Sequence, residues 1–208
     1  MKQILNSHIR GAIRQVGYFA LMILFALGMW KAGDIFKSIA VQEYGILETA
    51  QSAILFTAAL CYIINAMRAK ACRSLLWMLG MILLLALVRE QDAYFDDLIP
   101  VIGWKWGWIF PVIGGIILYR HRAQLLREAT RFIQSNAFHM MICAAVVMIP
   151  VAQCLGHRSY LQDLLSNPYY DVSLIRRILE ESIELIVYFI ILLSSMESFV
   201  EFSRKAED

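Results

Sequence analysis

The sequence is poor in charge. Only 17% of its 208 residues are Asp, Glu, Lys or Arg, whereas 60% are hydrophobic. A soluble domain is about 25% charged and roughly 45–50% apolar. This deficit excludes an ordinary soluble domain and indicates a polytopic membrane protein. The basic residues stand in short groups between apolar runs, which argues against a nucleic-acid partner.

The chain has four cysteines and four histidines, and neither set has the spacing of a metal site. The cysteines form no C-x-x-C pair, so neither a zinc site nor a disulfide framework is expected. The histidines form no H-x-x-H or H-E-x-x-H pair, which disfavours haem ligation and a histidine-bound zinc hydrolase. We therefore predict no metal and no cofactor.

The first apolar run lacks a signal-peptide cleavage site. Lys2, Arg10 and Arg14 precede YFALMILFALGMW as in a signal peptide, but WKAGD is a poor A-x-A-like site. We interpret this run as the first transmembrane helix. The chain also has no internal repeat, low-complexity stretch or linker, which predicts one polytopic domain over residues 1–208.

Six apolar runs approach the roughly 20 residues that a helix needs to cross a hydrocarbon core of about 30 Å. We expect the third run to continue as helix through REQD at residues 89–92. The sequence therefore predicts an all-α bundle of six transmembrane helices. Their approximate ranges are residues 13–30, 46–67, 74–92, 101–119, 137–155 and 178–200.

Six spans place alternate connections on opposite sides of the membrane, and the charges sort accordingly. The side that holds both termini has twelve of the 19 Lys and Arg and five of the 17 Asp and Glu; the other side has the remainder. Lys and Arg accumulate on the cytoplasmic side of membrane proteins. The sequence thus predicts a multi-pass protein of a bacterial-type plasma (inner) membrane with both termini cytoplasmic.

Polar side chains gather at the predicted outer ends of four spans, beginning with the stretch VREQDAYFDD after the apolar run of the third. Charges near the membrane interior are costly, so they normally face the bundle interior and pair. We expect these side chains to line an acidic pocket that opens outwards and binds a ligand. The candidate ligand-binding residues are Glu48, Gln51, Arg89, Glu90, Asp92, Lys105, Glu181 and Glu184.

A purely structural role is an alternative explanation for these polar residues. Asp96 and Asp97 are typical of charges that mark the exit of a helix from the membrane, and a buried polar network can serve only to fasten helices together. The tryptophans of WKWGW, residues 104–108, are typical of an aromatic belt at the membrane interface.

Three classes of function remain open on the sequence alone. The first is a channel, transporter or sensor whose pocket binds or moves a cation, a proton or a small polar ligand. The second is a membrane enzyme acting on a lipid or polyprenyl headgroup, with carboxylates as acid and base and Arg89 and Lys105 as phosphate ligands. The third is a component of a defence or signalling complex.

The apolar spans, the glycines and the basic stretch between the fourth and fifth spans indicate which partners to expect. The lipid bilayer is one partner, and the glycines of the fourth span leave homo-oligomerisation open. The basic helical stretch RHRAQLLREATRF, residues 120–132, is expected to face the cytoplasmic leaflet, where it offers a surface to anionic lipid or to a cytoplasmic partner.

Overall fold

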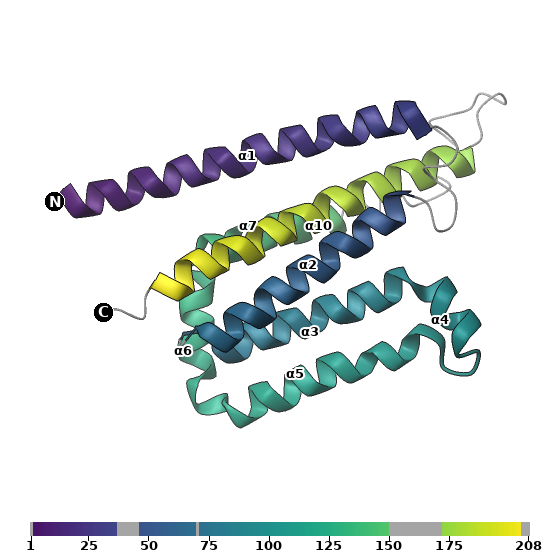
Figure 1. The fold of residues 1–208 in the computed structure, drawn as a ribbon. Helices are drawn as coiled ribbons and strands as arrows, with labels where there is room; N and C mark the ends of the chain where they lie inside the picture. The colour runs from purple at the N-terminus through teal and green to yellow at the C-terminus, as the bar shows by residue number, and fades with distance from the viewer. Residues whose placement is uncertain (1, 37–45, 70, 150–171, 205–208) are drawn as a thin grey trace. The chain divides into compact units, whose positions relative to one another are not determined.

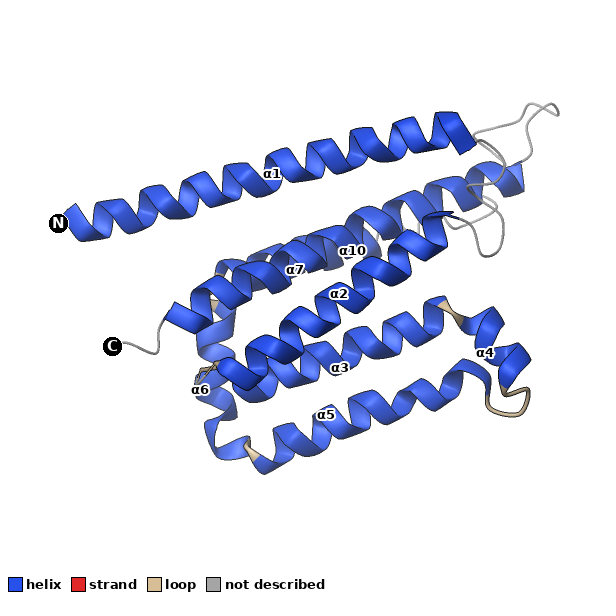
Figure 2. Ribbon diagram, in the orientation of Figure 1, coloured by secondary structure: helices blue, strands red, loops and turns tan. Residues whose placement is uncertain are grey.

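All regular structure described in a computed structural model of the chain is helical (Figure 2). The described residues are 2–36, 46–69, 71–149 and 172–204. They divide into two compact units, Met1–Gly45 and Ile46–Asp208. The prediction of an all-α protein is confirmed, while the prediction of one domain stays a prediction.

The described residues of the first unit form one long helix, α1 (Lys2–Phe36). Its central stretch, Gly11–Gly28, is apolar enough to cross a membrane. Large apolar side chains such as Ile13, Val16, Phe19 and Leu24 are exposed along it. The predicted first span lies within this helix, which extends beyond it in both directions.

The second unit is built around two long helices that pack side by side, α2 and α10. Helix α2 also packs against α3, α3 packs against α5, and α10 packs against α7. Helix α6 crosses one end of this row and contacts α3, α5 and α7 (Figure 1). The elements are α2 (Ile46–Arg68), α3 (Arg73–Glu90), α4 (Asp92–Leu98), η2 (Gly103–Trp108), α5 (Ile109–Arg120), α6 (Arg122–Ile133), α7 (Asn136–Val147) and α10 (Val172–Arg204).

Three described helices are long and apolar enough to cross a membrane, or four if one bent pair is a single span. They contain Gly11–Gly28, Leu47–Arg68 and Arg177–Phe202; the bent pair is Arg73–Glu90 with Asp92–Leu98. The predicted fourth span begins as the 3-10 helix η2 and continues as α5, and the fifth begins as α7. Residues 150–155 of the fifth lie outside the described residues.

The expected helix through residues 89–92 is wrong at its end. Helix α3 stops at Glu90, and α4 begins at Asp92 after a bend of 73°. Gln91 lies at the break, where its amide Nε2 donates a hydrogen bond to Ser52 Oγ of α2 (2.8 Å). The bend therefore turns Asp92, Asp96 and Asp97 away from the axis of α3.

Close approach of α5 to α3 depends on Gly114. A β-carbon at this position would lie 2.8 Å from Met78 Sδ and 3.3 Å from Met78 Cα, both in α3. The adjacent Gly115 is different, because nothing lies within 4 Å of a β-carbon built there. Small residues allow helix backbones to approach in this way, so Gly114 is the packing glycine of the pair.

Substituting Gly114 with Leu should therefore destabilise the protein, while the same change at Gly115 should not. Overpacking of this kind costs about 1–3 kcal/mol, whereas a surface change stays within about 0.5 kcal/mol. Thermal unfolding of the two variants in the same detergent measures the difference. Equal melting temperatures for the two variants would contradict the assigned α3–α5 contact.

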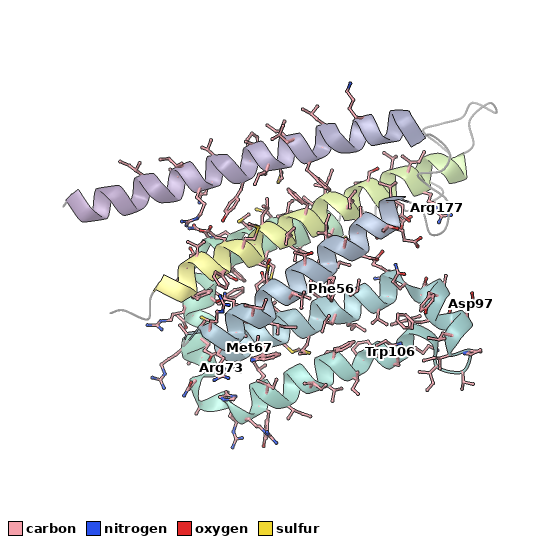
Figure 3. The ribbon with its side chains drawn as sticks, viewed as in Figure 1. Phe56, Met67, Arg73, Asp97, Trp106 and Arg177 are labelled. Carbon is pink, nitrogen blue, oxygen red and sulfur yellow. The ribbon has the colours of Figure 1, made fainter. Side chains whose placement is uncertain are left out.

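Acidic residues outnumber basic ones at one end of the second unit, and basic residues outnumber acidic ones at the other. In Figure 3, Asp97, Trp106 and Arg177 lie at one end, and Met67 and Arg73 lie at the other. The first end carries the starts of α2 and α10 together with the end of α3 and helix α4; we call it the acidic end. The opposite end carries α6 and its arginines, and we call it the basic end.

Candidate functional site

Four carboxylates from three helices form a cluster at the acidic end. Glu90 of α3 interacts electrostatically with Glu181 of α10 and with Glu48 of α2. Glu184 of α10 interacts with Glu90 and Glu181. All four side chains are half-buried. We call Glu48, Glu90, Glu181 and Glu184 the acidic cluster.

Among the described residues, Arg89 is a cation beside Glu90 and Glu184. Its guanidinium interacts with both Glu90 and Glu184, while its side chain remains exposed. Glu90 and Glu184 repel each other and are both repelled by Glu181. Partial burial strengthens repulsion between like charges because less water screens them, so a positive ligand at this place would be favoured.

Gln51 of α2 connects this helix to the cluster by hydrogen bonds to Glu181 of α10. The Gln51 side chain is fully buried, and its Nε2 donates hydrogen bonds to the main-chain oxygen of Glu181 (3.1 Å) and to Glu181 Oε2 (2.8 Å). The other end of the amide, Oε1, has no hydrogen-bond partner among the described residues. A buried acceptor without a partner is costly, and here it lies on the side chain that binds a cluster carboxylate.

Tyr188 fastens the cluster from the α10 side. Its hydroxyl donates a 2.6 Å hydrogen bond to Glu90 Oε1. Tyr188 lies one turn after Glu184, so the hydroxyl connects α10 to α3 at the depth where the carboxylates meet. Together with Gln51, this bond joins all three helices through the acids themselves.

Asp92 and Lys105, two of the predicted ligand residues, are exposed to solvent. Asp92 is exposed at the start of α4, where its Oδ1 accepts a hydrogen bond from the Ala93 amide (2.7 Å). Lys105 is exposed in η2. Neither is among the electrostatic neighbours of Glu90 or Glu184. The structure thus brings together Glu48, Gln51, Arg89, Glu90, Glu181 and Glu184.

The aromatic residues beside Lys105 pack against the α4 turn. The Trp106 ring lies 5.2 Å from that of Phe95 and 5.5 Å from that of Phe110, in edge or tilted geometry. Trp108, in contrast, is exposed. The WKWGW stretch therefore has a packing role through Trp106, and its exposed Trp108 suits an interfacial anchor.

The cluster is not arranged as a preformed metal centre. Across residues 2–36, 46–69, 71–149 and 172–204, no three His, Cys, Asp or Glu side chains surround a common point as metal ligands. A calcium ion takes six to eight oxygen ligands, but Mg²⁺ keeps several waters and binds through one or two carboxylates. Only a cation that retains water fits this donor set.

An apolar layer lies below the cluster. The fully buried residues of α2 form one stripe at helical spacing, from Gln51 through Leu55 and Ala58 to Tyr62 and Asn65. Leu55 and Ala58 separate the polar ends of this stripe. Gln51 and Tyr62 are eleven residues apart, which is about 16 Å along a helix. The acidic cluster is thus closed off from the other end within this interface.

Polar contacts resume on the basic side of that layer. Tyr62 and Ser194 share a 2.8 Å hydrogen bond between their hydroxyls, and Ser194 Oγ also donates to the main-chain oxygen of Ala137 (2.7 Å). Asn65 Nδ2 donates to Ser198 Oγ (3.1 Å). These bonds join α2, α10 and α7, and such interhelical bonds each contribute about 0.6 kcal/mol.

Two carboxylates at the basic end bind the starts of other helices, a role that we did not predict. Glu128 Oε2 of α6 accepts hydrogen bonds from the Ser74 amide (3.1 Å), the Leu75 amide (3.2 Å) and Ser74 Oγ at the start of α3. Glu201 Oε1 of α10 accepts one from the Asn136 amide at the start of α7 (3.1 Å). Amides at a helix start lack internal partners and favour anions.

A signal for Glu128 was present in the sequence. It is the lone acid of a basic helix, and Leu125 and Phe132 lie three and four residues from it, on the same face. An acid on the apolar face of an amphipathic helix needs a donor, and the nearest start of a predicted span supplied one.

Comparison with known proteins adds nothing to the site, since the chain matches no family model, no curated protein and no solved structure.

Proposed function

We propose that the chain is a six-span protein of a bacterial-type inner membrane, with its basic end and both termini in the cytoplasm. Three to four helices suitable for crossing a membrane support this proposal. Exposed apolar side chains in the middle of the second unit, among them Phe56, Ile82, Val112 and Val146, support it as well. The arginines of α6 favour the cytoplasmic side for the basic end.

We further propose that the acidic cluster binds a hydrated cation from the outer side, with Mg²⁺ as the representative ion. The observation that carries the proposal is the electrostatic contact of Glu90 with Glu48, Glu181 and Glu184, three carboxylates from two other helices. The fully buried Gln51 Oε1, which has no hydrogen-bond partner among the residues that the structure describes, is a second observation. Carboxylate and amide oxygens are the donors that hard cations prefer.

Two features favour cation binding over ion conduction and over enzymatic action on a lipid. The apolar layer at Leu55 and Ala58 interrupts the polar groups of the α2–α10 interface, which favours a binding or sensing role over conduction through one protomer. Among the described residues, Arg89 interacts with Glu90 and Glu184, whereas Lys105 is exposed in η2 and is not among their electrostatic neighbours. Enzymatic attack on a lipid phosphate would need more positive charge there.

Calorimetric titration of the protein in lipid nanodiscs with Mg²⁺, Ca²⁺ and K⁺ tests this function. We expect saturable Mg²⁺ binding whose dissociation constant rises at least tenfold in Glu184→Gln, a loss of about 1.4 kcal/mol. The control Asp97→Asn removes an exposed carboxylate of α4 at the same end and should change the constant less than twofold. Equal constants in the two variants would assign the binding to general surface charge.

A further inference from the structure

The basic end contains a cavity that the cation site does not involve. It has a volume of about 480 Å³ and lies between α6 and the short connection from α2 to α3. One wall is formed by Ala71 and Cys72 of the connection. The other wall is formed by side chains of α6, among them Gln124, Arg127, Thr130 and Arg131.

The cavity wall on α6 is positively charged. Arg127 and Arg131 are four residues apart, so they lie on the same side of the helix one turn from each other, and both are exposed. Glu128 also lines the cavity, but its carboxylate already accepts hydrogen bonds from Ser74 and Leu75 at the start of α3. The two guanidinium groups are therefore left without a compensating acid in the wall that α6 contributes.

The positively charged wall favours an anionic ligand, and the surroundings of α6 indicate that this ligand is a lipid. Leu126 is 80% exposed and Ile133 is 52% exposed, and residues seven apart share one side of a helix. Phe132 and Glu128, in contrast, are buried against the bundle. A helix with an apolar edge and a basic edge lies in the plane of the membrane interface, at the depth of the headgroups.

We propose that Arg127 and Arg131 bind the phosphate of an anionic phospholipid, whose headgroup occupies the cavity between α6 and the α2–α3 connection. A guanidinium matches a phosphate group through paired N–H donors. Thr130 and Gln124 line the same cavity and add polar groups for the rest of the headgroup. The proposal rests on the proposed membrane topology and is independent of the cation site.

Native mass spectrometry of the full chain, with phosphatidylglycerol and phosphatidylcholine at equal concentration and no divalent cation, tests this site. We expect wild-type protein to retain phosphatidylglycerol preferentially, and Arg127→Gln/Arg131→Gln to lose about thirty-fold in apparent affinity for it. The matched control Arg120→Gln/Arg122→Gln removes equal charge from residues outside the cavity and should lose less than threefold.

Three results would overturn the assignment. Equal losses in the two double variants would make the preference a general charge effect. Displacement of the lipid by millimolar inorganic phosphate would identify a free anion as the occupant. Equal retention of the two lipids by wild-type protein would exclude a phosphatidylglycerol site. Glu184→Gln should keep the lipid adduct, so failure of the cation site and failure of the lipid site are distinguishable.

Discussion

Replacing Glu90 with Gln should stabilise the protein in the absence of divalent cations and abolish most of the stabilisation that Mg²⁺ provides. The substitution removes the carboxylate that Glu48, Glu181 and Glu184 each repel, and like charges in a partly buried site destabilise the fold. Gln retains an oxygen that can accept the hydrogen bond from Tyr188. The variant therefore keeps the α3–α10 contact while it loses the charge.

The stabilisation that Mg²⁺ should give the wild-type protein follows from the linkage between binding and folding. A ligand at a hundred times its dissociation constant stabilises the folded state by about 2.7 kcal/mol, which for a chain of this length raises the melting temperature by about 5–10 °C. Thermal unfolding with and without Mg²⁺ measures it in wild type and in Glu90→Gln. Asp97→Asn should retain the full rise. A rise of the same size in Glu90→Gln would remove Glu90 from the cation site.

Replacing Glu128 with Ala should cause a large loss of stability at the basic end. The carboxylate is buried and accepts hydrogen bonds from two amides and one hydroxyl at the start of α3. Its removal leaves those donors unpaired and opens space between α6 and α3. Loss of charged hydrogen bonds at a buried helix start costs about 2–4 kcal/mol.

Thermal unfolding of Glu128→Ala should show a melting temperature lowered by about 5–15 °C. The control is Thr130→Ala, whose hydroxyl donates to the Leu126 main-chain oxygen within α6 (2.8 Å) and whose side chain is exposed. That variant should lie within about 0.5 kcal/mol of wild type. A Glu128→Ala protein as stable as the control would show that the bonds to α3 do not hold α6 in place.

The long helices were the most predictable part of the fold. The expected span over residues 46–67 is α2 (Ile46–Arg68), and the expected span over 178–200 lies inside α10 (Val172–Arg204). Both are uninterrupted apolar runs with polar residues at their ends, so composition alone defines them. Helix α6 was equally clear, because residues 120–132 alternate apolar and basic positions at helical spacing.

The break between α3 and α4 was not predictable in the same way. The stretch REQDAYFDD contains no proline or glycine, so local propensity favours one continuous helix. The bend coincides with tertiary contacts that no local pattern encodes: Gln91 donates to Ser52 of α2, and Phe95 packs against Trp106. These contacts determined which of the five charges in the stretch join the cluster and which leave it.

In the acidic cluster too, features within one helix were predictable from the sequence, and contacts between helices were not. Helical spacing predicted that Glu181 and Glu184 share a face of α10, and their depth indicated an inward orientation. Spacing within one helix could not indicate which acids of different helices meet, nor that Tyr188 and Gln51 join them. It also could not separate Glu90 from Asp92, since the two residues are neighbours across a bend that only the packed structure contains.

Native mass spectrometry of the purified protein in Mg²⁺ tests the central claim, that the acidic cluster is a cation site, most directly. We expect one specific Mg²⁺ adduct in wild type and in Asp97→Asn, and no such adduct in Glu184→Gln. An absent adduct in wild type, or an unchanged adduct in Glu184→Gln, would contradict that claim. The carboxylates would then serve to fasten α2, α3 and α10 together, as Gln51 and Tyr188 already do.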